Sequence, residues 1–351
     1  MSGKRQAASG NFSYCKNKNY LIYIVLLLLF INAPLYSQAT NNSIKEKMDS
    51  HIKETKLKWR YNPFRYETYK RIYGWLDPDA YISRYWMGDI FNIEEMYPNP
   101  AYRFDKMQFY HQPTLATEIN PIDFLYKGVH RFRIGVGFLT HLFMAIYKSD
   151  YQIYYGESLF FGTYMQTELY FDYIYNDTLR FRFTPVRHIC SHIGGDILGD
   201  SQLYDRNTEE FRDSSIEQMH FSLHYNYGYF TFYGGFSFAM SGFKESNFVN
   251  LFKMFYGTDF RYPIWGEISF IAGFYLAADY DRINTVNRIV DFREYEILDT
   301  LDKFYPCIAV GIGFEIYRFT VGMKYEFNRS RHLYAYRKME SKLGFEATLF
   351  F

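Results

Sequence analysis

The sequence predicts an all-β fold, a transmembrane antiparallel β-barrel of 10–12 strands of the bacterial outer-membrane type. The 351-residue chain is 22% aromatic, with 37 Tyr and 36 Phe, a density that suits a surface facing both lipid and water. From His130 onward apolar and polar residues alternate with period two. The alternating segments are about 10–17 residues long, which is enough for a tilted strand to cross a bilayer.

Composition and charge exclude several other classes of protein. The 39 Lys and Arg balance 38 Asp and Glu, so no excess of positive charge indicates nucleic-acid binding. Three Cys are too few for a disulfide scaffold, and 48% apolar residues are too many for a disordered chain. Beyond the N-terminus the apolar runs, such as Ile271–Ala278, fall far short of the roughly 18 residues of a membrane-spanning helix. Any membrane crossing must therefore use strands.

The first 39 residues have the parts of a secretory signal peptide. Basic residues precede the apolar run Leu21–Ile31, and Ser37 and Ala39 supply the small residues of a cleavage site. A membrane anchor is the alternative, but the run is shorter than the roughly 20 residues that span a bilayer. We therefore predict export to the bacterial outer membrane, with a signal peptide at 1–39, a periplasmic lead-in or N-terminal segment at 40–100 and the barrel at 101–351.

Alternation defines each predicted strand. Between Phe319 and Asn328, for example, apolar residues occupy the odd positions, whereas Lys324 and Glu326 occupy even ones. Such segments occur at 129–147, 159–176, 179–192, 215–228, 229–241, 248–262, 264–280, 304–316, 318–328 and 339–351. One more at 102–117, with a partner within 64–90, would raise the number from ten to twelve, because bacterial barrels have an even number of strands.

The links between the predicted strands are alternately short and mostly long, as in outer-membrane barrels. We assign the short links to the periplasmic end, where the last strand also finishes at Phe350 and Phe351. These short links are 176–178, 227–229, 262–263 and 317–318. Two of the long links, 193–214 and 281–303, are candidates for contact with a ligand.

The densest polar cluster lies on two neighbouring strands, near the end with the long links. The first strand and the link after it carry His188, Cys190, Ser191, His192 and Asp196, and the next strand carries His220, Ser222 and His224. Strict alternation places the even-numbered residues of the first strand in the lumen, namely Arg180, Arg182, His188, Cys190 and His192. With the hairpin centred near Tyr204, His188 would lie roughly opposite His220.

This stretch resembles a family of uncharacterised outer-membrane proteins, catalogued as a domain of unknown function of the DUF 1207 type. The likeness spans about residues 130–240, and the shared pattern is His-x-Ser-Ser-His-x-Gly-Asp after an Arg-rich strand. It is matched by Arg180, Arg182, His188, Ser191, His192 and Gly194. Cys190 stands where the family has Ser, and Gly195 where it has Asp, with Asp196 one place on. The resemblance implies a barrel in the outer membrane and leaves the activity open.

One interpretation of the cluster is catalytic. His-x-Ser on a barrel strand resembles the His and Ser of outer-membrane phospholipases and lipid A deacylases. Here His188 would activate Cys190 as the thiol equivalent, since residues i and i+2 share a face, and Ser191 is the other candidate nucleophile. Those lipases present their pair to lipid, however, whereas alternation points this pair inward.

Two further interpretations are open. In one, His188, His192, His220 and His224 bind a metal ion with Asp196 nearby, although no close ligand spacing supports it. In the other, the polar side chains fill a narrow lumen and hydrogen-bond one another there. A lumen of this kind could also bind a ligand through Arg180, Arg182, His192, Asp196, His220, Ser222 and His224.

From these patterns we predict a non-enzymatic outer-membrane barrel, acting as a structural protein, a narrow pore or a ligand-binding barrel. Inward-facing charge and the lack of a complete triad favour this prediction. The alternative is a hydrolase of lipid or lipopolysaccharide with a His188-centred site. The expected partners are outer-membrane lipid and the general outer-membrane assembly machinery, without nucleic acid or a cofactor. Cys190 and Cys307 are expected to be free thiols, because they would lie nearly opposite each other around the barrel.

Overall fold

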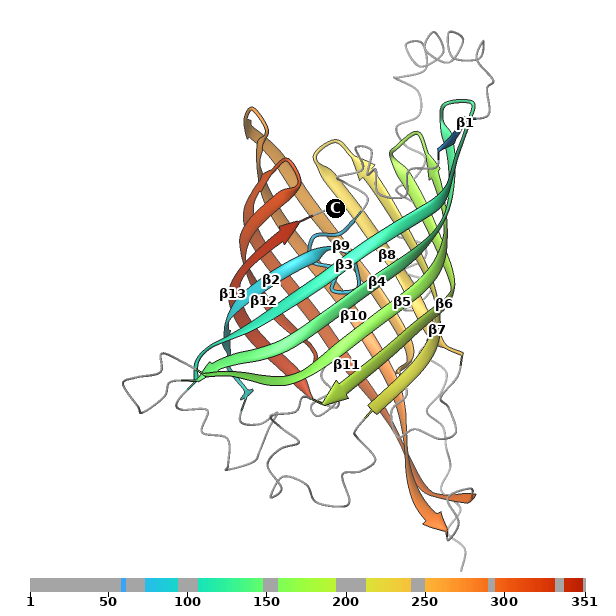
Figure 1. Cartoon of the computed structure of the whole chain (residues 1–351), viewed down its shortest axis with the longest axis vertical. Coiled ribbons are helices and arrows are strands. Elements are labelled where there is room, and N and C mark those ends of the chain that lie inside the picture. Colours follow the sequence, from blue (N-terminus) through green and yellow to red (C-terminus); the bar gives the residue numbers. More distant parts are fainter. Residues whose placement is uncertain are drawn as a thin grey trace, which may run out of the picture. The chain divides into compact units, whose positions relative to one another are not determined.

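The computed structural model describes residues 58–60, 73–93, 107–147, 157–193, 213–240, 250–289, 294–331 and 338–349. Nearly all of them belong to antiparallel strands (Figure 1). The strands are β1 Lys58–Arg60, β2 Ser83–Ile90, β3 Met107–Tyr126, β4 His130–Tyr147, β5 Glu157–Tyr175, β6 Leu179–Ile193, β7 Asp213–Tyr227, β8 Phe230–Ala239, β9 Asn250–Trp265, β10 Ile268–Ile289, β11 Glu294–Ile316, β12 Phe319–Arg329 and β13 Met339–Leu349.

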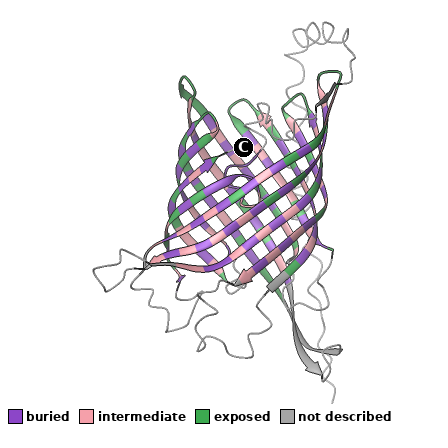
Figure 2. Cartoon of the chain, in the orientation of Figure 1, coloured by how far each residue is buried: buried purple, intermediate pink, exposed green. Residues whose placement is uncertain are grey.

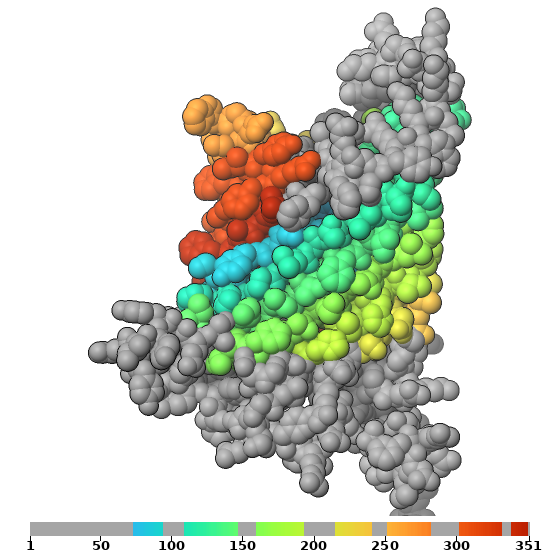
Figure 3. All heavy atoms as spheres, viewed as in Figure 1, coloured from blue at the N-terminus to red at the C-terminus, as the bar shows by residue number. Residues whose placement is uncertain are grey.

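Strands β2–β13 form a closed barrel of twelve strands. Each strand pairs with the next along the chain, and β2 closes the ring by pairing with both β3 and β13. In Figure 3 the red C-terminal strand accordingly lies beside the cyan β2. Closure leaves no free edge, so the backbone groups of the wall bond one another, as a strand protein in lipid requires. The predicted antiparallel barrel is confirmed, and it has twelve strands, the larger of the two predicted numbers.

The barrel begins earlier than predicted. β2 falls within residues 64–90, where a partner for the 102–117 segment was expected, and it pairs with β3 from Arg84 to Gly88. The barrel therefore begins at β2 and not at residue 101, the boundary that the sequence predicts. β2 is only eight residues long and is followed by Pro98 and Pro100, so its alternation is weak in the sequence.

At one end of the barrel tight turns join β3 to β4, β5 to β6, β7 to β8, β9 to β10 and β11 to β12, and we call it the turn end. Its turns include Gly128, Gly228 and Gly266 with positive φ, a conformation that glycine adopts without strain. The predicted turn at 262–263 was wrong, because β9 continues to Trp265 and the chain turns at Gly266. The opposite, loop end carries the long links; residues 194–212, and with them Asp196, lie outside the described residues. The predicted loop 281–303 is largely strand, because β10 and β11 extend to Ile289 and from Glu294.

Burial alternates along the wall as the sequence pattern predicts (Figure 2). On β12, Phe319, Val321 and Met323 are exposed, whereas Lys324 and Glu326 are buried in the lumen. The outer wall is therefore apolar and aromatic, and the lumen holds the charge, which is the arrangement of a barrel surrounded by lipid. No helix within the described residues is long and apolar enough to cross a membrane.

The lumen is occupied by residues Tyr73–Ile82, which precede β2 and which we call the lumenal segment. Trp75 and Leu76 are fully buried and pack against the inward side chains of β8–β11, among them Tyr233 and Tyr275. Arg84 donates hydrogen bonds to the carbonyl oxygens of Trp75 and Asp77, at 2.8 and 2.6 Å. Alternation gives no signal for this segment, but its five large aromatic or aliphatic residues are a signal of burial: Tyr73, Trp75, Leu76, Tyr81 and Ile82.

We expect Trp75→Ala to destabilise the barrel without changing its topology. The indole lies against Gly311 and Gly322, where a Cβ atom would come within 3.0 and 2.8 Å of the ring, so the wall is shaped around it. Removing a buried Trp leaves a cavity, and the free energy of unfolding should fall by about 3–5 kcal/mol. Urea unfolding of the protein in lipid vesicles measures this change. A midpoint equal to that of the wild type would contradict a packing role for the lumenal segment.

Candidate functional site

A β-bulge in β6 decides which candidate residues face outward. On β6, Phe183 and Val186 are three residues apart, but their partners on β5 are only two apart. The same difference occurs against β7, where the partners of Thr184 and Arg187 are two residues apart. β6 therefore carries one extra residue at Pro185–Val186. Before the bulge the even-numbered residues are buried in the lumen: Arg180, Arg182 and Thr184. After it the odd-numbered ones are inward: Arg187, Ile189 and Ser191. His188, Cys190 and His192 therefore lie on the outer wall, and the prediction that they face the lumen was wrong.

His188 has a carboxylate partner on the outer wall. Its neighbour across β6 and β7 is Glu217, and His188 Nδ1 lies 3.2 Å from Glu217 Oε1. The two side chains are 43% and 40% exposed, so both can be reached from outside the barrel. A carboxylate oxygen accepts hydrogen bonds, so Nδ1 is the donor, and in the neutral imidazole Nε2 then carries the lone pair. The pairing of His188 with His220 was wrong, because His220 lies opposite Thr184.

Cys190 is on the same outer face, two residues along β6 from His188. The rise of a strand separates their Cα atoms by about 6.6 Å, close enough for an imidazole and a thiol to meet. Cys190 is half-buried, and neither Cys190 nor Cys307 is part of a disulfide. Cys190, His188 and Glu217 thus lie close together on the outer face, with His188 between the other two along the strands.

The surroundings of this group are mixed and become apolar along the wall. Around it the outer face carries Thr167 and Met165 on β5, the strand neighbours of His188 and Cys190, and Ser215 on β7, the other neighbour of Cys190. Toward the turn end the same face becomes apolar and exposed, with Leu169, Val186, Phe181, Phe171 and Leu223. We call Thr167, His188, Cys190, Ser215 and Glu217 the outer patch. It lies toward the loop end of an otherwise apolar wall, where lipid head groups would meet the barrel.

Arg180 and Arg182 face the lumen, as predicted, and are held by carboxylates. Arg182 binds Asp172 at 2.7 Å, Glu168 at 3.1 Å and also Glu118, and its guanidinium lies 3.5 Å from the centre of the Tyr170 ring. Arg180 lies 3.3 Å from Asp172 and stacks over Tyr73 of the lumenal segment. These arginines join strands β3, β5 and β6 to one another.

The four histidines of the metal-binding interpretation do not come together. His220 and His224 are buried in the lumen and stack on Phe255 and Tyr233, with ring centroids 5.6 and 5.8 Å apart. His188 and His192 are on the outer face, so the barrel wall separates the two pairs. Among the residues that the structure describes, no three His, Cys, Asp or Glu side chains are placed to hold a metal ion together.

Ser191 and Ser222 also face the lumen. Ser191 Oγ donates to the carbonyl oxygens of Thr163 and Arg331, at 3.0 and 3.2 Å, so it is not available to a substrate outside the barrel. Ser222 is buried on β7. Cys190 is therefore the nucleophile candidate that shares a face with His188.

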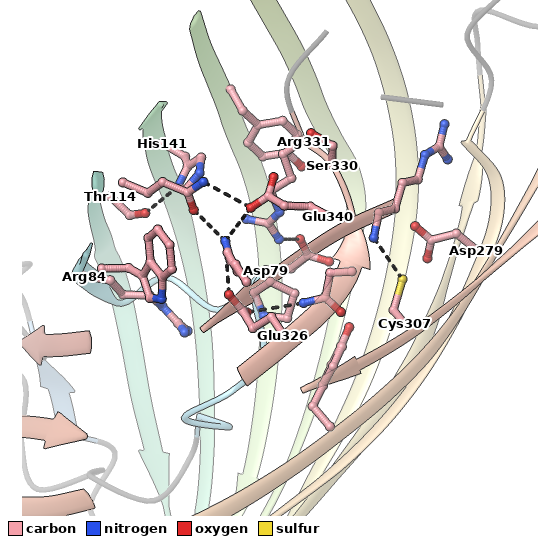
Figure 4. A pocket seen from close by; sticks show the side chains of 18 of the residues that line it. Asp79, Arg84, Thr114, His141, Asp279, Cys307, Glu326, Ser330, Arg331 and Glu340 are labelled. Atoms are coloured by element: carbon pink, nitrogen blue, oxygen red, sulfur yellow. Dashed lines mark hydrogen bonds and ion pairs between the residues drawn. The ribbon is translucent and has the colours of Figure 1, made fainter. Parts of the chain in front are cut away.

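The lumen contains a cavity of about 120 Å³ between the lumenal segment and the wall (Figure 4). Its lining is charged, but the charges are largely paired. Lys342 lies 3.1 Å from Glu326 and 2.9 Å from Glu340, and Lys324 pairs with Glu346. Asp79 pairs with Lys253 at 2.7 Å and with Arg331. Burial opposes ionisation of Asp79, but these two cations outweigh it and lower the pKa of the Asp79 carboxyl.

Sequence reasoning missed Glu217, the residue that completes the outer patch. A signal was present: alternation along β7 puts odd positions outward, where Met219, Phe221 and Leu223 are apolar and Glu217 carries a charge. An acid on a lipid-facing row is costly and therefore worth a functional hypothesis.

No family model matches the chain, and no curated protein matches it. Among solved structures, outer membrane phospholipase A from Escherichia coli is similar, at 9% identity and a TM-score of 0.47, covering 77% of this chain and 97% of that one. The outer membrane phospholipase dimer of Salmonella typhi, with bound calcium, gives 9% identity and a TM-score of 0.47, covering 78% and 94%. LpxR from Salmonella typhimurium gives 10% identity and a TM-score of 0.34, covering 77% and 98%. All are similar to this chain as β-barrels only.

Proposed function

We propose that the chain resides in the bacterial outer membrane and hydrolyses acyl esters of lipids there, with Cys190 as nucleophile, His188 as base and Glu217 as the group that orients His188. The observation that carries this proposal is the bond between His188 and Glu217 on the outer wall, beside Cys190. The site's position, toward the loop end of an apolar wall, supports a substrate that is itself part of the membrane. Lipid is therefore both the surroundings and the substrate.

The chemistry follows from the three side chains. Glu217 accepts a hydrogen bond from Nδ1–H of His188, so that Nε2 is free to take the proton of the Cys190 thiol. The thiolate attacks the ester carbonyl carbon, the carbon–oxygen bond of the lipid breaks, and the leaving alcohol takes the proton from His188. Water, deprotonated by His188, then cleaves the thioester. The products are a free fatty acid, a deacylated lipid and the restored thiol.

The direct test is release of fatty acid from phospholipid and lipopolysaccharide vesicles by the purified full-length protein. We expect His188→Asn to lower kcat by about 10²–10⁴-fold, because the general base is lost. Glu217→Gln should lower kcat less and change KM little, since Glu217 acts through His188. The matched control is His130→Asn, which removes an imidazole that bonds Tyr173 near the turn end. Equal turnover by His188→Asn and the wild type would overturn the proposal.

The second candidate is the structural barrel without enzymatic activity. It is favoured by the lumenal segment, which packs Trp75 and Leu76 against the inner wall and supports a lumen without an open channel. Under this candidate no lipid product appears in any variant, and conductance in planar bilayers stays at background. Steady conductance through the wild type would instead favour the narrow pore.

A further inference from the structure

The chain after β12 leaves the wall and crosses the lumen. Twelve strands close the ring, so β6 and β12 are six strands apart in either direction and lie on opposite sides. Arg331 nevertheless reaches the opposite wall: its carbonyl oxygen accepts the hydrogen bond from Ser191 Oγ on β6, at 3.2 Å. Its guanidinium lies 5.0 Å from the centre of the Tyr164 ring on β5. Ser330 and Arg331 thus link two opposite walls near the loop end.

The point of contact is directly behind the outer patch. Ser191 is the residue after Cys190, and its side chain points inward while that of Cys190 points outward. The same hydroxyl donates to the carbonyl oxygen of Thr163 on β5. Arg331 therefore holds the inner face of β6 at the position where the outer face carries Cys190.

Asp79 of the lumenal segment holds Arg331 in turn. The Asp79 carboxylate pairs with the Arg331 guanidinium and with Lys253 Nζ on β9, and all three side chains are largely buried. Figure 4 draws Asp79, Ser330 and Arg331 together around the cavity. A continuous chain of contacts runs from the lumenal segment through Asp79, Arg331 and Ser191 to the strand that carries Cys190.

We infer that Asp79 and Arg331 are positioning residues, which brace β6 from the lumen and so set the geometry of Cys190 and His188 on the outer wall. The reactivity of the outer patch then depends on the position of the lumenal segment, which carries Asp79. This inference rests on the proposed function for its effect on turnover, but the reactivity of the Cys190 thiol tests it independently.

The experiment measures alkylation of Cys190 by iodoacetamide as a function of pH, in the full-length protein in lipid vesicles, with the modified peptide quantified by mass spectrometry. In the wild type, pairing with His188 should place the midpoint of the profile below the ordinary thiol value of about 8.5. In Arg331→Gln and Asp79→Asn the midpoint should move toward that value, and kcat should fall by about 10–100-fold. The double variant should match the single ones, because both remove the same link.

Two further variants keep the inference falsifiable. Ser191→Ala removes the hydroxyl that bonds Thr163 and Arg331 but no charge, so it should fold and shift the midpoint in the same direction. Glu315→Gln removes a different buried lumenal carboxylate, which bonds Arg261 at 3.1 Å toward the turn end, and should leave the midpoint unchanged. An unshifted midpoint in folded Ser191→Ala and Arg331→Gln overturns the inference whether or not the wild type hydrolyses lipid. A shifted midpoint without any lipid turnover supports the inference and removes the proposed function alone.

Discussion

Substitution of Cys190 by alanine is expected to reduce fatty-acid release to the uncatalysed level. Cys190 is the residue that would form the covalent bond to the acyl group, and it lies two residues from His188 on the outer face of β6. Loss of a nucleophile is among the largest effects known in enzymes, about 10⁶-fold in kcat in a serine protease. The measurement is fatty-acid release from phospholipid vesicles, with the fold checked by heat-dependent migration in gels.

In the same assay, Cys190→Ser tests whether a hydroxyl can replace the thiol as nucleophile. Serine is close in size to cysteine and offers a hydroxyl in place of the thiol, so this variant should retain part of the activity. His188 would then deprotonate an alcohol, which is a weaker acid than a thiol, and the rate should increase more steeply with pH. Full activity in Cys190→Ala would remove Cys190 from the reaction and require another nucleophile, whereas the absence of fatty-acid release by the wild type would favour the structural barrel.

Arg182→Met is expected to produce the largest loss of stability. The Arg182 guanidinium is 4% exposed and pairs with the carboxylates of Asp172, Glu168 and Glu118. Removing it leaves these buried charges close together with less compensation, and breaking a buried ion pair in this way costs about 3–5 kcal/mol. The urea midpoint of the refolded protein should fall accordingly.

The control for Arg182 is Lys127→Gln, which removes a cation from an exposed turn at the turn end. Exposed charges contribute about 0–1 kcal/mol, so its midpoint should stay near that of the wild type. Midpoints that fall equally in the two variants would mean that the lumenal ion pairs do not hold β3, β5 and β6 together.

The alternation of residue types determined most of the barrel. Lipid outside and ion pairs inside impose a period of two on every strand, so Phe319 and Lys324 could be assigned to their faces from sequence alone. The same rule located the strands from β4 to β13 to within a few residues at most ends. The strand prediction was least accurate for β2, where the alternating stretch is short, and for β10 and β11, which extend into the expected loop 281–303.

Only the tertiary structure decided which face carries the candidate site. One extra residue at Pro185–Val186 reverses the alternation, and a single sequence does not mark a bulge, because its position depends on the register with β5 and β7. The pairing of His188 with Glu217 likewise depends on register across a long link. The lumenal segment has no periodic pattern, and its burial follows from a barrel that must fill its own interior. The sequence thus determined the barrel, and strand register determined what its outer wall can do.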